Sequence, residues 1–131
     1  MSTVNVANIK SLTAAPPLFK NSSGIEKGRL IEAYCSFVGT GTVTKGESFN
    51  VSSITDNGTG DYTFVYTNNL DSTDYCPFGS QAGSATHPFV GGSETERLVG
   101  SCRMLYGTSG GSGAGGFQND PSRAYFIAIG G

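Results

Sequence analysis

The feature that most constrains the fold is the stretch FNVSSITDNGTGDYTFVYT at residues 49–67. In its last six residues, the aromatic side chains of Tyr62, Phe64 and Tyr66 alternate with threonine and valine. A period of two is typical of a strand with one buried face. Residues 56–61 contain an Asn-Gly step and a second glycine, which favour a tight turn. The sequence therefore predicts an antiparallel hairpin whose turn lies at Asn57-Gly58.

Strands are predicted in four further segments, which are residues 29–37, 75–78, 97–106 and 123–129. The first has Ile31, Ala33, Cys35 and Phe37 on one face.

Pro77 favours a sheet edge for the second segment, because proline donates no hydrogen bond. Gly100 predicts a kink within the third segment. Residues 79–93 and 108–116 are expected to be loops. No helical periodicity occurs after Arg29. The predicted fold class is therefore all-β, an antiparallel β-sandwich or partial barrel with an extended N-terminal arm.

Residues 1–27 differ from the rest and are predicted to form an N-terminal attachment arm, followed by a β-sandwich domain at residues 28–131. Pro16-Pro17 prevents a continuous helix in this segment. The apolar anchors of the arm are four side chains, Ile9, Leu12, Leu18 and Phe19. They cannot form a core alone, so we expect them to dock on another protein or on sister subunits. Disorder of the arm is the alternative.

The charge of the chain excludes one class of function. It carries 8 Lys plus Arg and 10 Asp plus Glu, with no basic run, whereas a nucleic-acid binder needs a basic stripe to neutralise phosphates. No apolar stretch approaches the ~20 residues of a membrane span, and the first ten residues lack the features of a secretory signal. We therefore expect no nucleic acid and no membrane insertion.

Hydrophobic residues make up only 37% of the chain, below the roughly 45–50% of a typical globular domain. Residues 124–129 contain more apolar side chains than one face of a strand can bury. Burial against further copies would cover this surplus. The sequence thus predicts a homotrimer that forms through the β-domain.

Three cysteines, at positions 35, 76 and 102, form neither a disulfide framework nor the paired spacing of a zinc site. They are expected to be free, buried thiols in a reducing compartment. The single histidine, His87, could act as a base for one of them, but no local pattern supports a nucleophile. An ordinary loop histidine is the expected role.

Oxygen-bearing side chains in the hairpin, Asp56, Asn57 and Asp61, could bind Ca²⁺. Such side chains in turns more often bond their own backbone, which is the role expected here.

Two pairs of carboxylates, Asp71 with Asp74 and Glu94 with Glu96, could cleave a glycosidic bond if they faced a substrate. They lie in polar segments, where solvated charge is expected. The glycine-rich run at 110–116 lacks the Lys-Ser/Thr of a phosphate-binding loop and predicts a flexible loop. We therefore expect no enzyme activity, no catalytic or metal-binding residue and no cofactor.

Three segments carry a resemblance to a known family: FKNSSGIEKGRLIEAYCSFVGTGTV at 19–43, FNVSSITDNGTGDYTFVYTNNL at 49–70 and AYFIAIGG at 124–131. In order and pattern they resemble the small tail-fibre proteins of tailed bacteriophages, of the marine and cyanophage type. The core SSITDNGTGDYT of the second segment is the most distinctive. At Tyr34 the chain departs from similar sequences, which tend to carry tryptophan there.

The resemblance implies a non-enzymatic structural protein of the virion, assembled in the host cytoplasm. It would be a short tail-fibre or adhesin subunit, attached to the particle by its N-terminal arm and displaying a β-domain for host-surface contact. Its partners would be baseplate, tail or capsid proteins and a glycan or protein of the host surface. The alternatives are a capsid decoration protein (cement or head fibre), a polysaccharide-degrading fibre, or an unrelated soluble binding module.

Overall fold

A computed structural model describes residues 8–10, 19–82, 88–109 and 116–130 of the 131-residue chain. For residues 88, 89, 93–95, 109 and 116 it describes the backbone alone. The strands are β1 (Phe19–Lys20), β2 (Glu26–Gly28), β3 (Ile31–Val38), β4 (Thr44–Phe49), β5 (Val51–Gly58), β6 (Asp61–Tyr66), β7 (Cys76–Ala82), β8 (Pro88–Leu98), β9 (Ser101–Ser109), β10 (Gly116–Gln118) and β11 (Arg123–Ile129). The described residues contain no helix, so the prediction of an all-β fold is confirmed.

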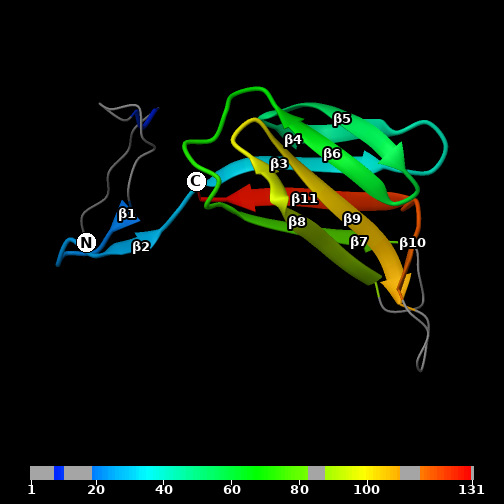
Figure 1. The fold of residues 1–131 in the computed structure, drawn as a ribbon. Helices are drawn as coiled ribbons and strands as arrows, with labels where there is room; N and C mark the ends of the chain where they lie inside the picture. Colours follow the sequence, from blue (N-terminus) through cyan, green and yellow to red (C-terminus); the bar gives the residue numbers. More distant parts are fainter. Residues whose placement is uncertain (1–7, 11–18, 83–87, 110–115, 131) are drawn as a thin grey trace. The chain divides into compact units, whose positions relative to one another are not determined.

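The strands after residue 30 form two antiparallel sheets (Figure 1). One sheet has the order β4-β3-β11-β7. The other has the order β10-β9-β6-β5, and β8 also pairs with β9. The two sheets pack face to face as a β-sandwich, which is one of the two predicted architectures. β4 and β7 are the edges of the four-stranded sheet, and the edge position of β7 confirms the expectation from Pro77.

Aromatic side chains fill the space between the sheets. Phe37 of β3 lies edge-on to Tyr62 and Phe64 of β6, with ring centroids 4.9 and 5.3 Å apart. Phe64 stacks on Phe126 of β11 at 4.3 Å. The alternation expected for residues 29–37 is confirmed for Ala33, Cys35 and Phe37, which point into this core, but it was wrong for Ile31, which is 47% exposed. The alternation expected for β6 is confirmed, and every second residue of β11 also points into the core. The buried hydrophobic residues are Ala33, Cys35, Phe37, Val51, Tyr62, Phe64, Tyr66, Leu70, Tyr75, Cys102, Met104, Tyr106, Ala124, Phe126 and Ala128.

A corner at Asn50 carries the chain from one sheet to the other. Asn50 has a φ of 54°, a left-handed conformation that asparagine tolerates better than most residues. Its side-chain amide donates to the carbonyls of Glu32 and Asn68, at 3.0 and 3.1 Å. The expectation that the hairpin begins at Phe49 was therefore wrong. Phe49 ends β4 in the first sheet, and Val51 begins β5 in the second.

The hairpin predicted from residues 49–67 is present as β5 and β6, but its turn lies elsewhere. Gly58 pairs with Asp61, so the turn consists of Thr59 and Gly60 rather than Asn57-Gly58. An irregularity between Asp56 and Gly58 shifts the pairing of β5 with β6, so that the turn follows Gly58 instead of including it. Gly60, with a φ of 67°, has the left-handed backbone conformation that favours glycine in such a turn.

Two other expectations were wrong. Residues 97–106 are not one kinked strand, because Val99 and Gly100 form a turn between β8 and β9. The expected loop at 79–93 instead contributes its ends to β7 and β8, while residues 83–87, including His87, lie outside the described residues. The second expected loop begins within β9, and its glycine-rich centre, 110–115, is also outside them.

The chain divides into two compact units, residues 1–30 and 31–131. In the first unit, β1 and β2 form a short hairpin, so the predicted domain boundary at 27/28 falls inside β2. The Asn21 side chain accepts hydrogen bonds from the backbone N–H groups of Ser23 and Ile25, which closes the turn between β1 and β2.

Two of the four predicted anchors are described, and both are exposed. Ile9 is 70% exposed and Phe19 is 45% exposed. Leu12 and Leu18 lie outside the described residues. Within the described part of the chain, no helix has the length and hydrophobicity needed to cross a membrane.

Candidate functional site

The strongest candidate is the outer face of the four-stranded sheet, the side that points away from the core. On it, four large side chains form one row across all four strands, since Phe49 pairs with Tyr34, Tyr34 with Ile127, and Ile127 with Phe78. The rings of Tyr34 and Phe49 stack at 6.2 Å. Phe49 and Phe78, on the two edge strands, are 54% and 63% exposed. We call these four residues the apolar row.

A second row lies beside the apolar row, where Ile129 pairs with Ile31 and with Cys76. A bulge in β3 between Ile31 and Ala33 places Ile31 opposite Ile129, on the outer face. Ile31, Ile129 and Cys76 are all exposed. Two adjacent rows of the outer face are therefore mainly apolar, although the opposite face of the same sheet already supplies the core.

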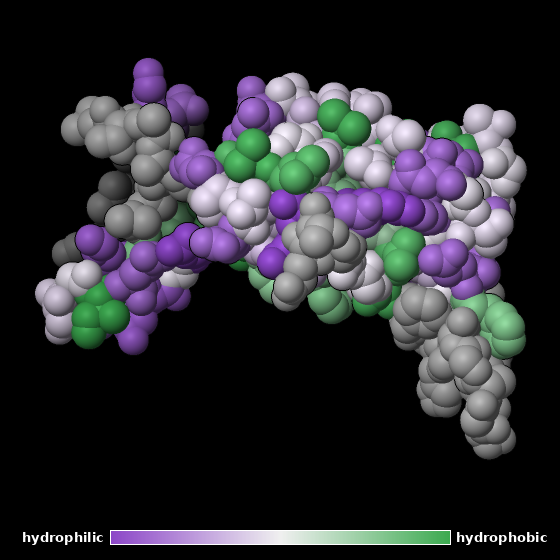
Figure 2. Space-filling model, viewed as in Figure 1, coloured by the Kyte–Doolittle hydropathy of each residue, from purple (hydrophilic) through white to green (hydrophobic). Residues whose placement is uncertain are grey.

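A shallow hollow of about 510 Å³ lies on this outer face. Tyr34, Tyr125 and Ile127 contribute apolar surface to it, and Glu47 and Arg123 are its charged side chains. Figure 2 looks onto the other side of the sandwich, the five-stranded sheet, where a band of hydrophilic residues runs between scattered hydrophobic ones. Sequence reasoning detected only the surplus apolar residues of 124–129. The rest of the surface depends on strand order, since Phe49, Tyr34 and Phe78 lie far apart in the sequence.

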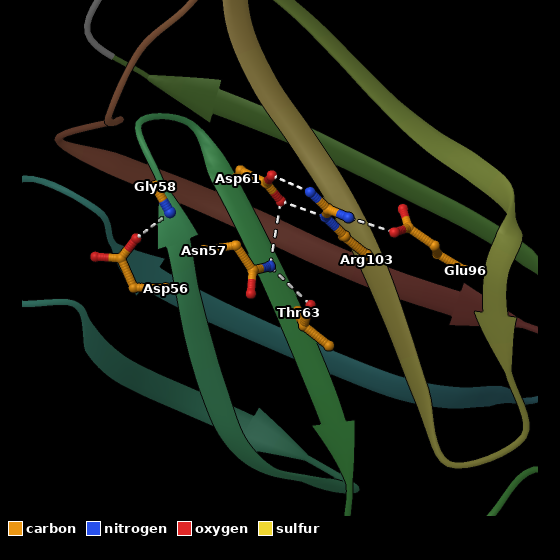
Figure 3. Close-up of polar contacts among 7 residues, drawn as sticks. All are labelled: Asp56, Asn57, Gly58, Asp61, Thr63, Glu96 and Arg103. Atoms are coloured by element: carbon orange, nitrogen blue, oxygen red, sulfur yellow. Dashed lines mark hydrogen bonds and ion pairs between the residues drawn. The ribbon is translucent and has the colours of Figure 1, made fainter.

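The outer face of the five-stranded sheet is polar by comparison. There, Asp61 and Arg103 form a two-pronged ion pair in which Arg103 Nε donates to Asp61 Oδ1 at 2.7 Å and Nη2 donates to Oδ2 (Figure 3). Arg103 also donates to Glu96. Asn57 adds hydrogen bonds to Asp61 and to the hydroxyl of Thr63, at 3.2 and 2.8 Å. The hydrogen bonds from Arg103 hold the pKa of Asp61 below its ordinary value, although partial burial acts in the opposite direction.

This network occupies the side chains considered for calcium. Asp61 is committed to Arg103, and Asp56 accepts a hydrogen bond from the backbone N–H of Gly58 at 3.0 Å. Among the described residues, no three His, Cys, Asp or Glu side chains gather where they could hold a metal ion. The arrangement of Asp56 matches the expected bonding of a turn side chain to its own backbone.

Replacing Asp61 with asparagine is expected to destabilise the protein at neutral pH and to have a smaller effect in acid. A carboxyl whose folded pKa is lowered contributes stability above its unfolded pKa, about 3.9, and loses that contribution as the pH falls through the folded pKa. Urea unfolding at pH 7, 5 and 3 should therefore show that the difference in unfolding free energy between wild type and Asp61→Asn shrinks as the pH falls. Asp71→Asn, at an exposed carboxylate, is the control. A constant difference between wild type and Asp61→Asn across this range would contradict the assigned role.

The three cysteines are free thiols in the structure, but they do not share one environment. Cys35 and Cys102 are buried in the core, as expected. Burial raises the pKa of Cys35 to about 11 and raises the pKa of Cys102 as well, so both are poor nucleophiles. The expectation of burial was wrong for Cys76, which starts β7 on the outer face and is exposed.

The structure describes the side chains of three of the four carboxylates considered for sugar cleavage. Asp71 and Asp74 are exposed, and Glu96 pairs with Arg103. The side chain of Glu94 lies outside the described residues.

A second hollow, of about 480 Å³, lies between the facing strands β7 and β8. Its lining residues are four apolar ones, three glycines, a serine and a glutamine: Pro77, Phe78, Val90, Met104, Gly79, Gly91, Gly92, Ser80 and Gln81. The side-chain amide of Gln81 donates to the carbonyl of Gly107, while its buried Oε1 has no hydrogen-bond partner among the described residues. None of the residues that line this hollow is charged, whereas Glu47 and Arg123 line the hollow on the outer face of the four-stranded sheet.

Comparisons of the chain with models of protein families, with curated proteins and with solved structures found no match.

Proposed function

We propose that the chain is a non-enzymatic structural protein of a bacteriophage virion, a short tail-fibre or adhesin subunit. Its N-terminal arm attaches to a baseplate, tail or capsid protein, and its β-sandwich is displayed for contact with a glycan or protein of the host surface. The subunit acts as a homotrimer formed through the β-sandwich.

The observation that carries the proposal is the resemblance of residues 49–70 to phage tail-fibre proteins. This segment forms the β5–β6 hairpin, which supplies Tyr62, Phe64 and Tyr66 to the core. A likeness in this segment therefore concerns the framework of the domain rather than a surface loop. The segments at 31–38 and 124–129, which share the resemblance, pair with each other as β3 and β11 at the centre of the other sheet.

The N-terminal unit supports the attachment role. It is a separate compact unit, and its described apolar side chains Ile9, Phe19 and Ile25 are 70%, 45% and 57% exposed. Exposed apolar side chains on a small unit favour binding to another protein, because docking removes them from water.

The proposal is tested with the phage that encodes the chain. Gradient-purified particles should contain the protein at tens of copies, measured by quantitative mass spectrometry. A phage lacking the gene should regain it in its particles when the wild-type chain is supplied from a plasmid. The double variant Ile9→Ser, Phe19→Ser should remain soluble but be lost from particles, because its arm has lost two apolar anchors.

The matched control is Lys10→Ser, Lys20→Ser, which alters exposed neighbours of the two anchors and should be incorporated normally. Absence of the wild-type chain from particles would overturn the proposal. Hundreds of copies per particle would replace the tail-fibre assignment with a capsid decoration protein. Normal incorporation of the anchor variant would show that the arm is not the attachment element.

A further inference from the structure

We infer that the outer face of the four-stranded sheet is the surface through which copies of this chain pack against one another. The inference rests on the proposed oligomer, not on its place in the virion. It names the contact as the apolar row of Phe49, Tyr34, Ile127 and Phe78, together with Ile31 and Ile129 beside it.

The extent of the exposed surface matches an interface between proteins. Phe49, Phe78, Ile31, Ile129 and Tyr125 are 41–63% exposed. Since a large side chain buries roughly 150–250 Å² when fully covered, these five expose on the order of 400–600 Å² together. Apolar patches of this size on a monomer are often functional. The partly buried Tyr34 and Ile127 and the polar side chains around them extend the face toward the roughly 800 Å² per partner of a stable interface.

The edges of the sheet do not offer the same opportunity. On β4, the charged side chain of Lys45 reaches β5 of the other sheet, where its ammonium group donates to the carbonyls of Val51 and Ser52 at 2.7 and 3.1 Å. On β7, Pro77 lacks the N–H group that a further strand would need. A charged side chain and a proline are the devices by which proteins block pairing at sheet edges. Association through the face, rather than by adding strands at an edge, follows from this contrast.

The charges of the face favour a second copy as the occupant. Glu47 and Arg123, one of each sign, are the charged side chains of the hollow on this face. A surface with balanced charges meets its own copy without the repulsion of like charges, and the two side chains can pair across the contact. On the outer face of the other sheet, by contrast, Arg103 is already paired with Asp61 and Glu96 of the same chain.

Light scattering coupled to size-exclusion chromatography, at tens of micromolar full-length protein, tests the inference. The wild type should be an oligomer, and the variant Phe49→Ser, Phe78→Ser should be a folded monomer. Both phenylalanines are more than half exposed, so their loss should leave the core intact, and circular dichroism checks this. The matched control is Leu98→Ser, Phe117→Ser, which removes apolar side chains of 53% and 63% exposure elsewhere on the sandwich and should remain an oligomer.

Cys76 supplies a second readout, because it lies on the proposed contact face while Cys35 and Cys102 are buried. Alkylation under native conditions should modify Cys76 slowly in the wild type and faster in the Phe49→Ser, Phe78→Ser variant. A monomeric wild type, or a variant that keeps its oligomer, would overturn the inference. A monomeric chain found in particles would overturn this inference and the proposed homotrimer but not the virion role. An oligomer that depends on the face but is absent from particles would overturn only the virion role.

Discussion

The variant Phe37→Ala is expected to lose about 3–5 kcal/mol of unfolding free energy, the usual cost of removing a buried aromatic ring. A typical domain has a total stability of roughly 5–15 kcal/mol, so the variant should be close to unfolded or marginally folded. The loss should be at the upper end because Phe37, on β3 of the four-stranded sheet, contacts three aromatic rings of the other sheet. Besides Tyr62 and Phe64 of β6, it meets Tyr106 of β9 edge-on at 5.2 Å. Each such edge-on pair contributes about 0.5–1.5 kcal/mol beyond the burial of area.

Urea unfolding followed by circular dichroism measures the change, since the chain has no tryptophan to report it by fluorescence. Wild type and variant are compared at one protein concentration, because association would make apparent stability depend on concentration. Phe117→Ala is the matched control, at a phenylalanine of 63% exposure on β10, and should change stability by less than about 0.5 kcal/mol. A loss below about 1 kcal/mol at Phe37 would contradict the arrangement in which this ring joins the sheets.

Local patterns predicted the parts of the fold that depend on alternation alone. The buried faces of β6 and of β3 from Ala33 onward follow from their own residues, because side chains alternate between the two sides of a strand. Alternation failed at Ile31, which a bulge moves to the outer face. The edge position of β7 followed from Pro77, since proline cannot donate to a neighbouring strand.

The wrong expectations arose where a residue's role depends on distant neighbours. Asn50 ends one strand and starts another because its side chain bonds backbone groups near residues 32 and 68, which no short window reveals. β4 was missed because its sequence, TKGESF, is largely polar, as an exposed edge strand allows. The turn at Gly100 resembled a kink because apolar residues flank it on both sides.

The candidate interaction surface shows the same limit. Phe49, Tyr34 and Phe78 become neighbours only through the strand order β4-β3-β11-β7. The sequence indicated that residues 124–129 had apolar surface to spare, but it did not indicate which other strands would extend that surface.

The second large effect is expected at Gly60, where alanine should lower the free energy of unfolding by about 2–5 kcal/mol. Gly60 is buried and has a φ of 67°, which by itself costs an L-residue about 1–2 kcal/mol. A Cβ atom there would also lie 2.8 Å from the backbone nitrogen of Asn119 and closer still to the carbonyl oxygen of Tyr106. These backbone atoms cannot move freely, because Gly60 accepts a hydrogen bond from Tyr106 N–H at 2.7 Å and donates one to Asp120 at 2.8 Å. Overpacking of this kind adds about 1–3 kcal/mol.

Gly58 provides the matched control, two residues away in the same hairpin. Its φ of 133° is also unfavourable for other residues, but no atom lies within 4 Å of the Cβ that alanine would add. Gly58→Ala should therefore cost only the backbone strain, about 1–3 kcal/mol, and less than Gly60→Ala. The comparison distinguishes the observed turn at Thr59-Gly60 from the one predicted at Asn57-Gly58. If urea unfolding showed Gly58→Ala to be the more damaging change, the packing of Gly60 against Tyr106 and Asn119 would be wrong.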